Sequence, residues 1–133
     1  MSDPLSTDDA RREAGMRTRR EVLGDAWVDR AVAGTTPLTQ DFQDFITRVA
    51  WGDVWQRPGL ERRERSIATL SICIALRHWD EFALHVRAAV HNGLSEAEIA
   101  EVLQHAAVYA GVPAANHAFK VAAPVLAELR GES

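Results

Sequence analysis

The most constraining feature of the sequence is an apolar run at residues 67–76, whose hydrophobic side chains fall on nearly every face of a helix. The helix is expected to begin near Glu61 and to end at Leu76. A helix that is hydrophobic all round is buried, either at the centre of a fold or at a subunit interface. We therefore expect this helix to lie in the core, and we expect so short a chain to complete that core as a homo-oligomer.

The other segments also follow the periodicity of helices, and no convincing period-2 pattern indicates a strand. Thr7 and Thr39 are predicted to cap two helices, Gly24 to end the first one, and Ser95 with Glu98 has the pattern of a capping box. Besides residues 61–76, the expected helices cover residues 7–23, 26–33, 39–50, 81–91, 95–111 and 113–130. The sequence thus predicts an all-α fold, a single-domain helical bundle.

One boundary stays open at this point. Residues 61–92 contain no Gly or Pro that would stop a helix before Asn92, so they form either one long helix or two. In the second case Asp80 would cap the second helix.

Aromatic residues are expected to anchor the packing. Phe42 and Phe45 lie at the (i, i+3) spacing of an inward helix face. Trp51, Trp55 and Trp79 are more typical of core or interface anchors than of stacking platforms for a ligand.

Length, charge and cysteine content exclude several classes of protein. A chain of 133 residues is expected to form one domain, spanning residues 1–133 with its core at about 10–130. A net charge of −4 gives no reason to expect nucleic acid or membrane lipid as a partner. The single cysteine, Cys73, excludes an internal disulfide and a CxxC redox pair, and its apolar neighbours predict a buried small hydrophobe. No signal peptide or membrane-spanning run is visible, so a cytoplasmic location is expected.

A cluster of ionisable residues follows the apolar run. On a helix, His78, Glu81 and His85 fall on one narrow face, because each residue turns about 100°. Glu81 and His85 are an (i, i+4) pair, and we expect the carboxylate to favour the imidazolium and so to raise the pKa of His85. Imidazoles and carboxylates held together are typical of proton transfer near neutral pH. The cluster therefore predicts an enzyme that uses acid–base chemistry.

Five segments, taken in order, resemble the carboxymuconolactone decarboxylase family, and the resemblance spans roughly residues 10–130. The segments are VLGD at 22–25, AWGDVW at 50–55, LERRERS at 60–66, EIAEVL at 98–103 and YAGVPAANHAF at 109–119. The resemblance implies an all-α fold of the alkyl hydroperoxidase D type and ring-shaped homo-oligomers, often hexamers. It also implies decarboxylation of 4-carboxymuconolactone to 3-oxoadipate enol-lactone, without a metal or organic cofactor, in the protocatechuate branch of the β-ketoadipate pathway.

The peroxidase branch of this superfamily carries a CxxCxxxH motif, with a glutamate about four helical turns earlier. The corresponding stretch here is His78-x-x-Glu81-x-x-x-His85, with Glu64 or a neighbour as the upstream acid. Both thiols are absent, which argues against peroxidase activity and leaves these four residues as the catalytic candidates. On one straight helix Glu64 would lie roughly 20 Å from His78. It joins the site only if the chain folds back after Leu76 or a neighbouring subunit supplies it.

Substrate contacts are predicted from charge and position. A dianionic substrate requires cationic groups, and Arg65 and Arg87 are the nearest arginines to the cluster in sequence; which of them binds the substrate stays open. Four further residues are candidate contacts, although the pattern places the first two on an exposed helix face: His105, Tyr109, Asn116 and His117.

Two other functions compete with this prediction. The first is a non-catalytic scaffold or binding protein of the same oligomeric fold. The second is a metal enzyme in which His78, Glu81 and His85 are the ligands, although the common HExxH spacing is absent.

Overall fold

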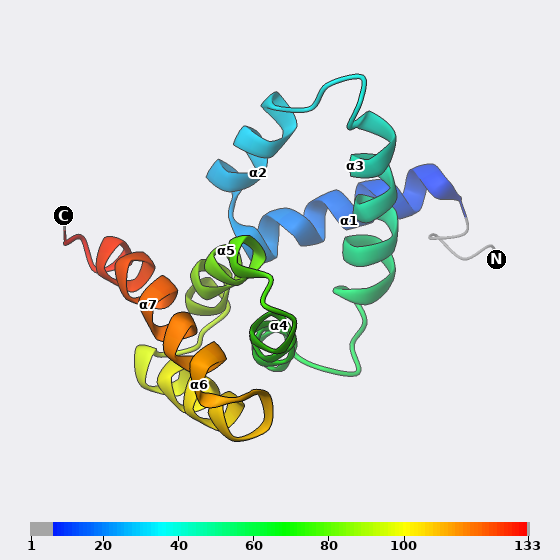
Figure 1. Cartoon of the computed structure of the whole chain (residues 1–133). Helices are drawn as coiled ribbons and strands as arrows, with labels where there is room; N and C mark the ends of the chain where they lie inside the picture. The colour runs from blue at the N-terminus through cyan, green and yellow to red at the C-terminus, as the bar shows by residue number, and fades with distance from the viewer. Residues whose placement is uncertain (1–6, 133) are drawn as a thin grey trace. The chain divides into compact units, whose positions relative to one another are not determined.

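The computed structural model describes residues 7–132, and all regular secondary structure in this range is helical (Figure 1). The all-α prediction is therefore confirmed for these residues. The chain divides into two compact units, one ending at Leu60 and the other beginning at Glu61, and each is considered on its own. The single-domain organisation stays a prediction.

The first unit contains α1 (Asp8–Leu23), α2 (Asp25–Ala33), α3 (Gln40–Ile46) and the π-helix η1 (Thr47–Val54). The predicted ends of α1 are confirmed. The hydroxyl of Thr7 accepts a hydrogen bond from the backbone N–H of Ala10 at 3.0 Å, and Gly24 ends the helix with a φ of 89°.

The helix after Thr39 differs from its prediction in two ways. Thr39 occupies the predicted N-cap position, but its side chain makes no capping hydrogen bond, because its hydroxyl instead accepts a hydrogen bond from the backbone N–H of Thr36 at 3.0 Å. The helix ends at Val54, within the segment 51–55 that was expected to end it, but its last part has the wider i→i+5 turns of a π-helix.

The buried side chains of this segment lie on η1 and just after it, and not on α3. Thr47, Trp51 and Trp55 are buried at intervals of four residues, and the two indole rings pack with their centroids 5.3 Å apart. Phe42 and Phe45 were expected to face inward but are 60% and 51% exposed. Both residues lie on the α-helical α3, and η1, rather than α3, makes the main contact with α1.

Two glycines let α1 and η1 approach closely. A Cβ atom on Gly15 would overlap the backbone carbonyl oxygen of Thr47. A Cβ atom on Gly52 would lie 2.7 Å from the carbonyl oxygen of Arg11. Only glycine fits at either position without moving the backbone.

The second unit contains α4 (Arg62–Leu76), α5 (Trp79–His91), α6 (Glu96–Ala110) and α7 (Val112–Leu129). Residues 61–92 thus form two helices. The break lies at Arg77, whose φ of 59° is left-handed, and the N–H of His78 closes the turn by donating to the carbonyl of Cys73 at 2.9 Å. His78, and not Asp80, occupies the N-cap position of α5.

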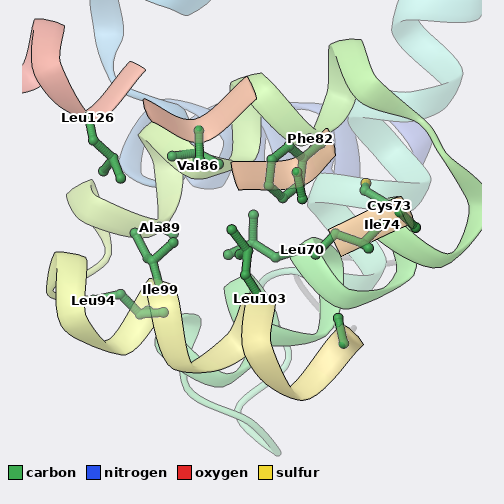
Figure 2. Packing of buried hydrophobic residues seen from close by; sticks show 14 residues of the cluster. Leu70, Cys73, Ile74, Phe82, Val86, Ala89, Leu94, Ile99, Leu103 and Leu126 are labelled. Atoms are coloured by element: carbon green, nitrogen blue, oxygen red, sulfur yellow. The ribbon is translucent and has the colours of Figure 1, made fainter. Parts of the chain in front are cut away.

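Side chains from all four helices form the core of this unit (Figure 2). Cys73 is one of its members, as expected for a buried small hydrophobe. However, α4 is not buried on every face within one chain, because Ile72 and Leu76 are 56% and 59% exposed. The main buried side chains of the core are Leu70, Ile74, Phe82, Val86, Ile99 and Leu103.

The predicted capping box at the start of α6 is confirmed. The backbone N–H of Glu98 donates to the hydroxyl of Ser95 at 3.1 Å, and the N–H of Ser95 donates to the carboxylate of Glu98 at 2.9 Å. Arg63 of α4 forms an ion pair with the same carboxylate, and this guanidinium lowers the pKa of Glu98 to about 2. Among residues 7–132, no helix is both long and apolar enough to span a membrane.

Candidate functional site

His85 is the buried ionisable group of α5. It lies beside the inward-facing Phe82 and Val86, and only 6% of its surface is exposed. Burial disfavours the imidazolium and lowers the pKa of His85 to about 4. The expectation that Glu81 raises this pKa is therefore wrong, because desolvation outweighs any effect of the carboxylate. The imidazole is neutral at pH 7.

Glu81 lies one turn before His85 on the same helix, but its side chain is exposed. Its charge reaches Cys73 on α4: burial, and then the Glu81 carboxylate, raises the pKa of the Cys73 thiol. The thiol is thus protonated and buried, which is unsuited to thiolate chemistry.

The other two catalytic candidates lie at opposite ends of a helical hairpin. The chain does fold back after Leu76, as the involvement of Glu64 required, and α4 packs along α5. A hydrogen bond joins Ser66 near the start of α4 to Asn92 at the end of α5, so the two helices are antiparallel. Glu64 is exposed in the first turn of α4, at the end remote from His78, which is exposed at the start of α5. The hairpin does not bring Glu64 and His78 together.

The alternative of a metal site depends on three converging ligands. Within the described range 7–132, no three His, Cys, Asp or Glu side chains are placed to hold a metal ion together. His78, Glu81 and His85 share a helix face but do not form such a set.

The two candidate arginines differ in their surroundings. Arg87 on α5 forms an ion pair with Glu128 of α7, with 2.9 Å between nitrogen and oxygen. Arg65 lies half-buried on α4, directly before the buried Ser66. A substrate carboxylate at Arg87 would therefore have to compete with Glu128.

His105 and Tyr109 lie together on α6, with their ring centroids 5.1 Å apart, and Tyr109 is 80% exposed. The exposure predicted from the pattern is therefore confirmed. Both residues border an open groove of about 490 Å³ between α4 and α6, which also includes Ile67, Ser71 and Ala75. Tyr109 thus lies at the edge of a groove.

His117 and Asn116 are neighbours in sequence, but their side chains lie next to different parts of the unit. The imidazole of His117 packs on the indole of Trp79 on α5, with 4.5 Å between the ring centroids. Asn116 borders a second open groove of about 570 Å³ between α6 and α7, together with Val112 and Phe119. The candidate substrate contacts are therefore spread over several surfaces of this unit.

Comparison with known proteins decides between the possible classes. The model of the carboxymuconolactone decarboxylase family matches residues 40–124, which is more than half of the chain. The chain belongs to the carboxymuconolactone decarboxylase family. The matched residues include η1, α4, α5 and α6, and they contain both Glu81 and His85.

Individual members of the carboxymuconolactone decarboxylase family are similar over nearly their whole length. The 4-carboxymuconolactone decarboxylase of Acinetobacter baylyi is 43% identical over 122 residues, covering 92% of this chain and 91% of that protein. The nitrosuccinic acid decarboxylase of Metarhizium robertsii is 44% identical over 124 residues, covering 91% and 87%. A 4-carboxymuconolactone decarboxylase of Pseudomonas putida is 51% identical over 43 residues, covering 32% of this chain and 90% of that protein. All three are decarboxylases, and this member of the family is accordingly a carboxy-lyase.

One polar contact within the α4–α5 hairpin was not predicted from the sequence. Ser66 is fully buried, and its hydroxyl accepts a hydrogen bond from the side-chain amide of Asn92 at 3.0 Å. The available signal was a serine at the start of an apolar helix face, with an asparagine at the end of the following helix. Their pairing depends on the turn at Arg77, which the sequence left open.

Proposed function

We propose that this protein decarboxylates 4-carboxymuconolactone to 3-oxoadipate enol-lactone, without a metal or organic cofactor, in protocatechuate catabolism by the β-ketoadipate pathway. The observation that carries the proposal is the 43% identity to the Acinetobacter baylyi enzyme over nearly the full length of both chains. The buried imidazole of His85 beside the exposed carboxylate of Glu81 supports acid–base chemistry at this place.

Nitrosuccinic acid is the second candidate substrate, because the Metarhizium robertsii relative is equally similar. The two substrates share a fragment. In both, one carbon carries the departing carboxylate, a CH2–COO⁻ arm and an electron-withdrawing group, which is a lactone ring in one and a nitro group in the other. The proposed substrate class is therefore a succinate whose C2 carries an electron acceptor.

The lactone substrate contains its own electron sink. The bond from the ring carbon to the carboxylate breaks and releases CO2. The electron pair moves through the ring double bond onto the lactone carbonyl oxygen, and a proton then adds to the carbon next to that carbonyl. The protein must stabilise the developing oxyanion and supply the proton.

His85 is proposed to supply this proton. It is neutral in the free enzyme, because burial lowers its pKa to about 4. A bound dianion beside the imidazole favours the charged form and raises this pKa, so substrate binding draws in a proton. Glu81 is exposed one turn away and is proposed to pass protons from solvent to His85. His78 and Glu64 stay predicted catalytic residues, both on the surface.

Arg65 and Arg87 stay the candidate partners for the acetate arm of the substrate, and at Arg87 the substrate carboxylate would have to compete with Glu128. The apolar wall of α4 is proposed to surround the departing carboxylate, since a poorly solvated pocket disfavours its charge. His105, Tyr109, Asn116 and His117 stay predicted substrate contacts.

The protein is proposed to act in the cytoplasm as a homo-oligomeric ring, most simply a hexamer. Apolar side chains exposed on one chain support an assembly that covers them. These include Ile72 and Leu76 on α4, Val108 and Tyr109 on α6, and Val112 on α7. The rival from another class is a scaffold of the same fold, which would use this surface without catalysis.

The proposal is tested by incubating the purified protein with 4-carboxymuconolactone and, separately, with nitrosuccinate. CO2 release and enol-lactone formation are followed with and without EDTA. Turnover of the lactone that EDTA does not affect supports the proposal. Turnover of nitrosuccinate alone would identify nitrosuccinate as the substrate in place of the lactone. Loss of activity with EDTA that one metal restores would indicate a metal-dependent mechanism. No turnover of either compound would favour the scaffold.

A further inference from the structure

The hydrogen bond between Ser66 and Asn92 connects the two helices of the α4–α5 hairpin. Ser66 is completely buried on α4, and the side-chain amide of Asn92, at the C-cap of α5, donates to its hydroxyl at 3.0 Å. A buried hydroxyl without a partner destabilises the folded state, so this bond favours one arrangement of the two helices over others.

Asn92 lies on the same side of α5 as His85. The two residues are seven apart, which is two helical turns and about 10 Å along the helix axis. A rotation of α5 about its axis therefore moves both side chains in the same direction.

Apolar packing alone does not fix this rotation sharply. Phe82, Val86 and Ala89 join α5 to the core around Leu70 (Figure 2), but apolar contact is not directional. At its N-terminal end, α5 is connected to α4 by the left-handed turn at Arg77. At the C-terminal end of α5, the side-chain hydrogen bond of Asn92 to Ser66 is a directional contact with α4. The ion pair of Arg87 with Glu128 is a directional contact of α5 with α7, but it does not join α5 to α4.

Arg63 of α4 also makes polar contacts near the C-terminal end of α5, but with residues that follow this helix. Its guanidinium donates to the backbone carbonyl of Gly93 at 2.7 Å and forms an ion pair with Glu98. These contacts hold the connection between α5 and α6, whereas Asn92 belongs to α5.

We propose that Asn92 is a positioning residue: through its hydrogen bond to the buried Ser66 it sets the rotation of α5 and thereby the place of the His85 imidazole. A rotation of about 10° moves an atom about 6 Å from the helix axis by about 1 Å. A displacement of that size costs up to about 10²-fold in rate when the displaced group takes part in the reaction. The rate effect rests on the proposed function, but the placement of His85 is measurable without turnover.

The test compares Asn92→Ala, Ser66→Ala and the double variant with the wild-type protein by NMR of the histidine side chains over about pH 5 to 8. The resonance of His85 is assigned by its loss in His85→Gln. Thr69→Val is the matched control, because the half-buried hydroxyl of Thr69 on α4 donates to the carbonyl of Arg65 in its own helix and not to α5.

The wild-type resonance should barely titrate in this range, because burial holds the pKa of His85 near 4. In Asn92→Ala and Ser66→Ala the imidazole should meet water, and its midpoint should rise toward about 6.5, the ordinary value. The double variant should show the same midpoint as either single variant, since all three break one bond. Thr69→Val should match the wild-type protein, and kcat should fall by about 10- to 10²-fold in the first three variants with a smaller change in KM.

The proposal would be overturned if the variants were less stable to urea but the titration of their His85 resonance were the same as in the wild-type protein. The bond would then have only a structural role. Larger effects in the double variant than in either single variant would exclude the Ser66 bond as the route. If Asn92→Ala does not fold, Ser66→Ala decides alone. If the wild-type protein turns over neither substrate while the resonance moves as expected, the proposed function fails and the positioning role stands.

Discussion

Glu81 and His85 are one helical turn apart on α5, yet the carboxylate is exposed and the imidazole is buried. Burial therefore decides the charge of His85 in the free protein, and the pair is arranged with one member toward solvent and the other toward the interior. This arrangement has consequences for stability, for the pH dependence of the rate and for catalysis.

The first prediction concerns stability. The pKa of His85 is about 4 in the folded protein against 6.5 for an ordinary histidine, so the unfolded chain binds more protons between these values. The contribution of His85 to the free energy of unfolding is fully present above about pH 6.5, where the imidazole is neutral in both states. It is lost as the pH falls toward 4, because the unfolded chain takes up the proton first, and the loss amounts to about 3 kcal/mol. His85→Gln should flatten this dependence in urea unfolding measured across that range.

The exposed His91, on the same helix, provides the control for this prediction. His91→Gln should keep the pH dependence of the wild-type protein. An equally steep loss of stability in His85→Gln would mean that other groups cause it.

The second prediction concerns Glu81. Glu81 is proposed to pass protons between solvent and His85 without contacting the reacting carbon. Glu81→Gln should therefore lower kcat by about 10-fold or more, which is less than the 10²–10⁴-fold typical of a group that protonates the substrate directly. The alkaline limb of kcat/KM should keep its position, because burial and not Glu81 sets the pKa of His85 in the free enzyme. A pH–rate profile with a solvent isotope effect measures both. A limb displaced to lower pH would show that the carboxylate does control the imidazole.

The third prediction concerns the contact between α1 and η1. Gly15→Ala should destabilise the protein by about 1–3 kcal/mol or more, because the added methyl group overlaps the carbonyl oxygen of Thr47. Alanine is otherwise the better helix former, so propensity alone predicts the opposite sign. Gly59→Ala is the control, since a Cβ there meets nothing within 4 Å and should change stability by less than about 0.5 kcal/mol. Equal midpoints of urea unfolding for Gly15→Ala and the wild-type protein would remove this contact from the account.

The caps illustrate how far local sequence determined the fold. Thr7, Gly24 and the Ser95–Glu98 pair act within one turn of the chain, so their residue types alone located the helix ends correctly. Arg77 could not be found this way, because a left-handed arginine is uncommon and is imposed by the packing of α5 against α4. The π-helix was missed for the same reason, since the close approach of Gly15 to Thr47 joins distant segments.

The candidate site was predictable in its residue types but not in its environments. Spacing located Glu81 and His85 on one face, and the family resemblance singled out His85. The sign of the pKa change depends on burial by the folded chain, which spacing does not report. The ion pair of Arg87 with Glu128 and the ring contact of His117 with Trp79 join helices that the sequence pattern does not relate.

The fourth prediction separates the decarboxylase from a thiol peroxidase. Cys73→Ser should leave decarboxylation nearly intact, because the thiol is buried and its pKa is raised by burial and by Glu81. The buried hydroxyl should destabilise the protein by about 1–3 kcal/mol, and Cys73→Ala is the control for lost packing. Thiol-dependent peroxide consumption by the wild-type protein that disappears in Cys73→Ser would restore the redox hypothesis.

The most direct test of the account is the rate of CO2 release from 4-carboxymuconolactone by His85→Gln, in protein shown by light scattering and circular dichroism to assemble and fold like the wild type. Removing the proton donor should lower the rate by about 10²–10⁴-fold, the usual contribution of general acid catalysis. A rate equal to that of the wild-type protein would contradict the central claim and remove His85 from the mechanism.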